Sequence, residues 1–157
     1  MPNPFQRSRW YHKISNMTSA RMFRVQAMPR GFVLLTVTGR KTGKRYYRPI
    51  RAVRIGDTFY ASAILGEGSD WLRNVRKNPQ VSLKHGRKTV PATAREVTDA
   101  AEAERATKEY VESVYPFDRI DYPIVDWWLP TRGAIVKAHR DWLERGKLVA
   151  LDVGEGA

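Results

Sequence analysis

The chain places a basic turn, Thr38-Gly39-Arg40-Lys41-Thr42-Gly43-Lys44-Arg45, between two runs with the pattern of β-strands. The run before it is Phe32-Val33-Leu34-Leu35-Thr36-Val37, which is apolar and rich in β-branched residues, and the run after it begins at Tyr46. The two glycines allow positive φ angles and leave backbone N–H groups exposed. The stretch therefore predicts a β-hairpin whose tip carries four cationic side chains.

This hairpin tip has two interpretations. Its amides and cationic side chains are suited to holding an anionic group, either a phosphate or a carboxylate. Alternatively, the tip is a solvated turn that carries charge for solubility. In both cases we expect the side chains of Arg40 and Lys41 to face solvent.

Beyond this hairpin, the pattern predicts a small antiparallel barrel. The expected strands are residues 32–38, 45–54, 58–63, 80–85, 88–97 and 147–153. Turn sequences around Gly56 and Gly86 favour tight hairpins between neighbouring strands. Closure into a barrel removes the edges that an open sheet would leave exposed. The fold class is thus α+β, with about six mainly antiparallel strands and flanking helices.

Three helices are predicted beside these strands, over residues 70–77, 99–114 and 132–145. Ser69 or Asp70 can act as N-cap of the first helix, and Asp99 of the second. Gly146 follows the third helix as a C′ residue that stops it.

The first 30 residues are predicted to form a basic amphipathic helical arm, followed by the barrel domain over residues 31–157. A basic helix with large apolar side chains can lie in a membrane interface. It can equally pack its apolar stripe on the domain. The sequence leaves both arrangements open.

Composition excludes several classes of protein. The 157 residues contain no cysteine, so disulfides, iron–sulfur clusters and thiol nucleophiles are ruled out. The three histidines lack the spacing of metal ligands, so no metal site is expected. The chain has no Gly-x-Ser-x-Gly motif of a nucleophilic hydrolase and no apolar run long enough to span a bilayer.

A formal net charge of +12 predicts attraction to a polyanion, whether nucleic acid, anionic lipid or a charged small molecule. The cations are spread along the chain and no helix-turn-helix or ribonucleoprotein motif is present. A nucleic-acid partner is therefore not expected, although a basic nucleic-acid-binding domain remains an alternative.

Two motifs about thirty residues apart carry a resemblance to a known family. The first is Thr38-Gly39-Arg40-Lys41-Thr42-Gly43, and the second is Trp71-Leu72-Arg73-Asn74-Val75-Arg76-Lys77-Asn78-Pro79, with Pro49-Ile50 between them. Together they resemble the deazaflavin-dependent nitroreductase family, whose members bind coenzyme F420 in a split β-barrel of the FMN-binding type. The similarity extends from about Gly31 to Pro116.

The resemblance implies coenzyme F420 as the cofactor, with FMN as the alternative. The anionic phosphate and glutamate tail of F420 would meet the basic turn, and its ring would lie against the strands and the start of the 70–77 helix. The implied cofactor-binding residues are Gly39, Arg40, Lys41, Thr42, Gly43, Arg45, Arg48, Pro49, Ile50, Ala63, Ile64, Ser69, Trp71 and Asn74.

The resemblance also implies hydride transfer from the reduced deazaflavin to a hydrophobic acceptor: a quinone, an enone or a nitro compound. Tyr115, in a Tyr-Pro pair that matches the family's substrate-side loop, is the candidate catalytic donor to the acceptor. Its alternative role is an aromatic plug at the end of a helix. Asp118 stands where a further tyrosine is expected, so the substrate pocket is not transferable.

The sequence leaves open whether the barrel is catalytic, how it assembles and whether it contacts a membrane. The alternative to an enzyme is a non-catalytic barrel that binds a lipid, haem or flavin. Split barrels commonly dimerise, which makes a homodimer an expectation of the resemblance. The expected location is the cytoplasm, with peripheral contact to the anionic inner face of the plasma membrane if the N-terminal arm binds lipid.

Overall fold

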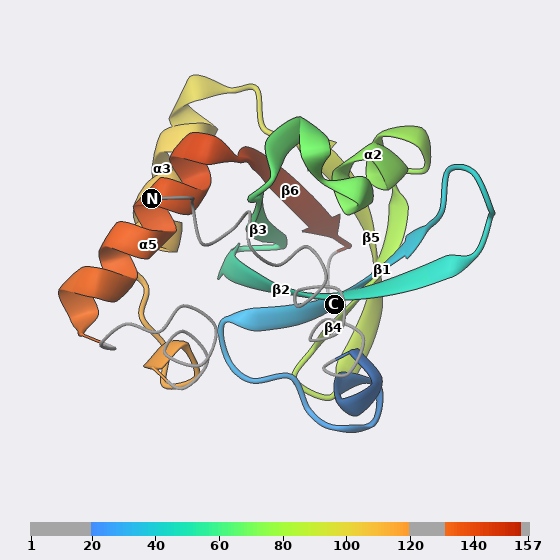
Figure 1. The fold of residues 1–157 in the computed structure, drawn as a ribbon, viewed down its shortest axis with the longest axis horizontal. Coiled ribbons are helices and arrows are strands. Elements are labelled where there is room, and N and C mark those ends of the chain that lie inside the picture. The colour runs from blue at the N-terminus through green and yellow to red at the C-terminus, as the bar shows by residue number, and fades with distance from the viewer. Residues whose placement is uncertain (1–19, 120–130, 155–157) are drawn as a thin grey trace, which may run out of the picture.

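The computed structural model describes residues 20–119 and 131–154, in which six antiparallel strands form a closed barrel (Figure 1). The strands are β1 (Phe32–Thr38), β2 (Arg45–Ile55), β3 (Thr58–Ala63), β4 (Gln80–His85), β5 (Lys88–Glu96) and β6 (Lys147–Val153). Their order is β1-β2-β3-β6-β5-β4, and pairing of β1 with β4 closes the ring. The predicted fold class is confirmed.

Helices cover two parts of the barrel surface. They are α2 (Asp70–Lys77), α3 (Ala100–Glu112) and α5 (Arg132–Arg145), with a short 3₁₀ turn η2 (Gly66–Gly68) before α2. Helices α3 and α5 lie side by side on one flank, whereas α2 packs on β1 and β5 (Figure 1). Asp99 caps α3 as predicted, its side chain accepting the N–H of Glu102 at 2.8 Å. Each described helix is too short or too polar to cross a bilayer.

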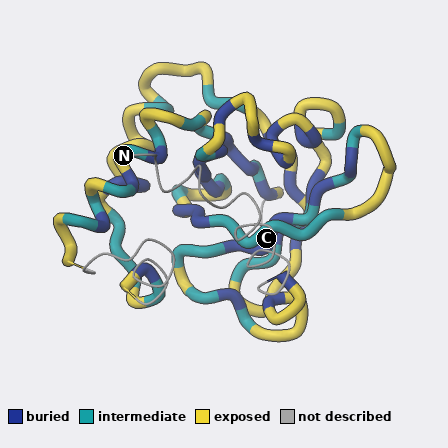
Figure 2. The backbone as a smooth tube through the Cα atoms, in the orientation of Figure 1, coloured by how far each residue is buried: buried dark blue, intermediate teal, exposed yellow. Residues whose placement is uncertain are grey.

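The buried residues of the described chain (Figure 2) include an inner and an outer core. Leu35, Leu83 and Leu151 fill the barrel interior, which α2 completes with Leu72. Outside the barrel, α3 and α5 bury aromatic and aliphatic side chains against β2 and β3, namely Ala106, Tyr110, Ile135, Trp142, Val53 and Tyr60. Burial of this apolar surface is the main driving force for attaching the two helices.

The barrel is split between β2 and β3. These strands pair only at the four positions Ala52–Ile55 of β2, whereas β2 pairs with β1 from Arg45 to Arg51. Strand β3 continues to Ala63 by pairing with β6 instead. Among the described residues, the first half of β2 therefore has a strand neighbour on one side only.

Gly146 ends α5 for a reason other than the predicted one. Its φ of −98° is not the left-handed conformation of a C′ glycine. A Cβ at this position would lie 2.5 Å from the carbonyl oxygen of Ala63 and 2.5 Å from Oγ of Ser62. The glycine is needed because the end of α5 approaches the backbone of β3 this closely.

We expect His139 to make the stability of this fold pH-dependent. The side chain is fully buried. Its pKa is lowered to about 3, mainly by this burial and also by the positive charge of the nearby Arg51 guanidinium. Because the unfolded chain binds this proton below about pH 6.5, the free energy of unfolding is expected to fall by about 2 kcal/mol between pH 7 and pH 5. Urea denaturation at the two pH values measures this change. His139→Gln should flatten the dependence in this range, and an unchanged slope in that variant would assign the effect to other groups.

Candidate cofactor site

The basic turn is closed by its own backbone, and its two glycines are needed for different reasons. Gly39 N–H donates to the carbonyl of Lys44 at 2.8 Å, and Gly43 N–H donates to the carbonyl of Gly39 at 2.9 Å. Gly43 has a φ of +68°, which favours glycine. A Cβ on Gly39 would lie 2.5 Å from the ring of Tyr46, so space rather than backbone conformation selects glycine there.

Thr42 holds the inside of the same turn. Its hydroxyl accepts the N–H of Lys44 at 3.2 Å and lies 3.0 Å from the hydroxyl of Tyr46. The backbone amides of Lys41 and Thr42 make no hydrogen bond within the part of the chain that the structure describes. Exposed successive amides of this kind suit an anionic ligand.

Asn74 fastens the turn to helix α2. Its buried Oδ1 accepts the backbone N–H of Arg40 at 3.1 Å and the Nη1 of Arg40 at 2.9 Å. The Arg40 guanidinium also lies 3.5 Å from Asp70, and its side chain is only 24% exposed. The expectation that Arg40 faces solvent is wrong, because its donors hold the turn against α2.

The remaining cations of the turn are exposed. Lys41, Lys44 and Arg45 form no hydrogen bond or ion pair through their side chains with the described residues. Their charges are therefore available to an external anion, and the extended projection of the hairpin beyond the barrel makes the tip accessible (Figure 1). A strongly anionic cofactor tail fits this end of the site.

Strand β2 leads from the turn along the split. The part of β2 that is not paired with β3 contains three half-buried residues, Arg48, Pro49 and Ile50. Tyr46 and Ile50 pack against the inner core, and alternation puts Arg48 on the same face of the strand. This row offers apolar contact and one cation beside the part of β2 that is not paired with β3, which suits a flat polar ring system.

Other predicted site residues lie in the core. The side chains of Ala63, Ser69 and Trp71 are buried, and Ala63 and Trp71 belong to the inner core. Ser69 is the N-cap of α2, but its side chain makes no capping hydrogen bond. Ile64 is half-buried against the α3–α5 core. These four side chains contribute packing that positions α2 and the end of β3.

Tyr115 lies at the opposite end of the β1–β2 hairpin from the basic turn. Its ring occupies the space left by the missing side chain of Gly31, which has a φ of +90°. The guanidinium groups of Arg30 and Arg51 lie 5.2 and 5.8 Å from the ring centroid. At about 3.3 Å per residue, the length of β1 separates this end from the turn by roughly 25 Å. A single ligand that contacts both ends would have to be elongated.

Sequence reasoning missed the buried ion pair that holds the Tyr115 turn. Arg51 donates to the carbonyl of Tyr110 at 3.0 Å and to that of Ser113, and its Nε lies 3.4 Å from Asp118 Oδ1. The other Asp118 oxygen accepts the N–H of Tyr115 at 2.8 Å. The alternation of side-chain direction along β2 could have predicted that Arg51 is buried, because it puts Arg51 on the face covered by α3. Arg51 and Asp118 together fix the backbone of the turn that carries Tyr115.

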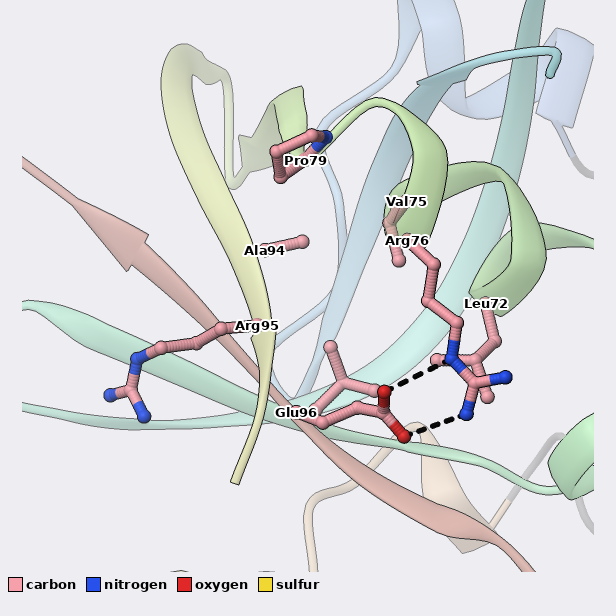
Figure 3. A pocket seen from close by; sticks show the side chains of 8 residues that line it. Leu72, Val75, Arg76, Pro79, Ala94, Arg95 and Glu96 are labelled. Atoms are coloured by element: carbon pink, nitrogen blue, oxygen red, sulfur yellow. Dashed lines mark hydrogen bonds and ion pairs between the residues drawn. The ribbon is translucent and has the colours of Figure 1, made fainter. Parts of the chain in front are cut away.

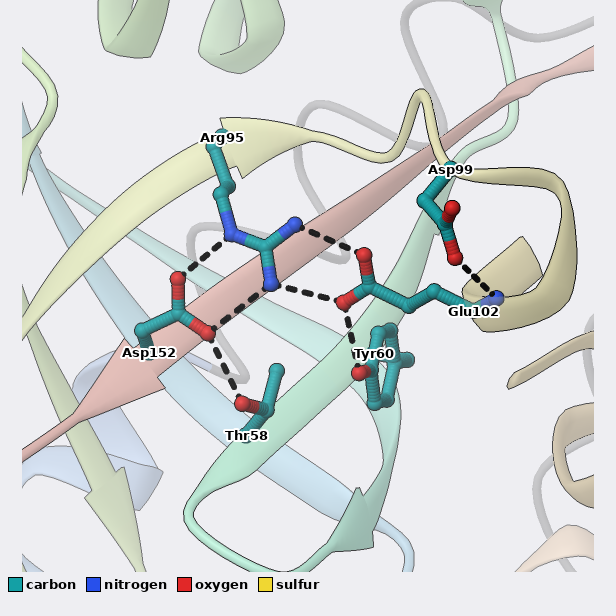
Figure 4. A network of polar contacts seen from close by, with 6 residues as sticks. All are labelled: Thr58, Tyr60, Arg95, Asp99, Glu102 and Asp152. Carbon is teal, nitrogen blue, oxygen red and sulfur yellow. Dashed lines mark hydrogen bonds and ion pairs between the residues drawn. The ribbon is translucent and has the colours of Figure 1, made fainter. Parts of the chain in front are cut away.

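Two further polar clusters link elements of the fold to one another. A shallow pocket between α2 and β5 is crossed by Arg76, which donates to Glu96 at 2.8 and 3.0 Å (Figure 3). On the barrel surface, Arg95 bridges Asp152 and Glu102, and its hydrogen bonds lower the pKa of Glu102 to about 2 (Figure 4). Within the described ranges, no group of acidic or histidine side chains is arranged to hold a metal ion.

Comparison with known proteins identifies the family of this chain. Residues 6–120 match the model of the F420H2-dependent quinone reductase family. A solved structure of the F420H2-dependent reductase FDR-A is 27% identical, with a TM-score of 0.56 over 82% of this chain and 99% of that one. Another, described as a domain-swapped dimer, is 26% identical with a TM-score of 0.56, covering 91% of this chain and 97% of that one.

A haem-binding protein from Mycobacterium smegmatis shares the fold alone. It is 13% identical with a TM-score of 0.53, over 88% of this chain and 54% of that one. By contrast, the family model covers the basic turn, both sides of the split and Tyr115. The chain therefore belongs to the F420H2-dependent quinone reductase family, whose members are reductases that use the deazaflavin coenzyme F420.

Proposed function

We propose that this chain passes a hydride from F420H2 to a quinone-type acceptor held at the Tyr115 end of the site. The observation that carries the proposal is the exposed, glycine-flanked cationic turn beside the split of a barrel in this family. Reduced F420 supplies the hydride when bound, and the protein supplies binding, orientation and electrostatics.

Different parts of the β1–β2 hairpin are proposed to bind different parts of the cofactor. The amides of Lys41 and Thr42 and the side chains of Lys41, Lys44 and Arg45 bind the anionic tail. Arg40 and Asn74 keep the turn on α2. The half-buried residues Arg48, Pro49 and Ile50 line the ring position beside the split.

Tyr115 is proposed to act on the acceptor. Its phenol donates a hydrogen bond to an acceptor oxygen and stabilises the negative charge that develops there as the hydride arrives. The neighbouring Arg30 guanidinium adds positive potential at this end, whereas the charge of Arg51 is balanced by Asp118. Enones and nitro compounds, which develop charge on oxygen in the same way, are included in the proposed acceptor range.

Two finer features of the proposal concern assembly and location. The neighbour described as a domain-swapped dimer supports a homodimer for this chain as well. The net charge of +12 supports peripheral contact with an anionic membrane surface, where a lipophilic quinone would be found. The first 19 residues, on which that membrane prediction mainly depends, lie outside the described part of the chain.

Anaerobic turnover tests the proposed activity. Purified protein is mixed with F420H2 and a panel of quinones, enones and nitroaromatics, and formation of oxidised F420 is followed by its absorbance. We expect saturable, protein-dependent oxidation of F420H2 with quinones, and no rate above the protein-free reaction when reduced FMN replaces it. Tyr115→Phe should lower kcat more than it raises the Kd of F420. Tight F420 binding without turnover of any acceptor would instead support a carrier.

A further inference from the structure

We propose that Lys84 is a positioning residue for the acceptor end of the site, because it anchors residues 20–28 between β2 and the Tyr115 turn. This inference rests on the proposed function. Lys84, on β4, donates from Nζ to three backbone carbonyls, those of Phe23 at 2.8 Å, Arg24 at 3.1 Å and Gln26 at 2.6 Å. An ammonium group has three N–H donors, so all of them are used on this one segment.

The three carbonyls lie at the end of a short helix over residues 20–25. The last carbonyls of a helix have no partner within the helix, and a cation there also meets the negative end of the helix dipole. Lys84 thus supplies hydrogen-bond donors to the carbonyls at this helix end. A second bond, from the N–H of Met28 to the carbonyl of Gly86 at 2.7 Å, ties the same segment to the β4–β5 turn.

The anchored segment contacts both β2 and the turn that carries Tyr115. The guanidinium of Arg24 lies 4.4 Å above the ring of Tyr47 on β2, on the strand face opposite Arg48 and Ile50. The ring of Phe23 meets that of Phe117 edge-on at 6.3 Å, and Phe117 is two residues after Tyr115. Residues 20–28 therefore bridge the cofactor strand and the turn that carries the candidate donor.

These contacts produce an aromatic wall, composed of Phe23, Phe32, Tyr47 and Phe117 around buried Leu34. The rings of Phe32 and Phe117 are 5.1 Å apart and edge-on. A flat, apolar, conjugated acceptor such as a quinone is the ligand class that an aromatic wall binds well. Lys84 touches neither cofactor nor acceptor, but it fixes the backbone on which one face of this wall is built.

The anchor should affect the acceptor without affecting the cofactor tail. The basic turn is held to α2 by Asn74, and residues 20–28 contact β2 at Tyr47 rather than the turn itself. Loss of hydrogen bonds that stabilise the segment by about 1.4 kcal/mol corresponds to a tenfold change in its opening equilibrium. The acceptor KM is therefore expected to rise while F420 binding stays the same.

The test compares Lys84→Met with Lys84→Arg and with Lys108→Met, which removes an exposed lysine on α3. For Lys84→Met we expect hydrogen exchange in residues 20–28 to rise about tenfold and the quinone KM to rise about fivefold or more. The kcat at saturating quinone and the Kd of F420 should stay within twofold. Lys84→Arg, which keeps donors for the carbonyls, should recover most of the KM, and Lys108→Met should match wild type.

Three results would overturn the inference. Unchanged exchange in residues 20–28 would show that Lys84 is not the anchor. Faster exchange with an unchanged quinone KM would show that the segment is no part of the acceptor site. Equal loss of F420 binding and acceptor binding would assign a general structural role. Failure of the proposed function is distinguishable, because wild-type protein would then turn over no quinone while the exchange measurement still reports on the anchor.

Discussion

Replacing Arg51 by methionine is expected to lower the free energy of unfolding by about 3–5 kcal/mol, the cost of leaving a buried charge without its partner. Asp118 is fully buried, and Arg51 is 6% exposed. Arg51→Met would also remove the donors to the carbonyls of Tyr110 and Ser113 at the end of α3. Urea denaturation at pH 7.5 measures the change. The same variant should raise the acceptor KM, because the Tyr115 turn loses its support.

The exposed Arg54 provides a matched control on the same strand. Arg54 forms a 3.7 Å ion pair with Asp57, with both side chains substantially exposed, so Arg54→Met should cost less than about 1 kcal/mol. In the double variant Arg51→Met/Asp118→Leu, no charge is left buried, and its loss of stability should be smaller than that of Arg51→Met alone. Similar costs for Arg51→Met and Arg54→Met would contradict the assignment of a buried, coupled pair.

The strands were predictable because the signals that form them are local. Glycines at 56 and 86 take φ angles of +60° and +55° at the two tight hairpins, as their turn positions require. Strand β1 begins where the apolar, β-branched run begins and ends one residue after it, at Thr38. Given six such strands, barrel closure follows from the need to cover their edges.

Contacts between distant segments were not predictable in the same way. Asn74 accepts from Arg40 across 34 positions of sequence, and a pattern of residue types does not specify that partner. The charge of Arg40 suggested an exposed group, whereas its geometry makes it a link between turn and helix. The same reasoning applies to Gly146, where a tertiary approach to β3 selects the glycine.

The same distinction between local pattern and tertiary contact applies to the predicted site residues. The resemblance to a known family identified the turn and the α2 motif as functional, and the structure separates their exposed members from their packed ones. Lys41 and Arg45 are available to a ligand, whereas Trp71 and Ala63 are part of the inner core. Motif membership thus indicates where a site lies, but burial is needed to tell binding side chains from supporting ones.

Charge reversal at the turn, Lys41→Glu with Lys44→Glu, is expected to weaken F420 binding by about 100-fold at low salt. Each exposed contact to the anionic tail contributes about 0.5–1 kcal/mol, and reversal adds repulsion of similar size. Titration of the protein with F420, followed by quenching of tryptophan fluorescence, gives the Kd. The loss should shrink as salt is raised to 1 M, because surface charges are then screened within about 3 Å.

A control of equal net charge separates local contact from a general field effect. Lys108→Glu with Arg140→Glu makes the same change of charge on the exposed faces of α3 and α5. If the tail contacts the turn, this control should weaken F420 binding less than threefold, since long-range effects fall off over the screening length. Equal losses in the two double variants would mean that only the overall charge attracts the cofactor. Arg40 is left intact in this design because it holds the turn to α2, and its loss would alter the turn as well as its charge. Unchanged binding in the turn variant would show that the tail of F420 is bound elsewhere.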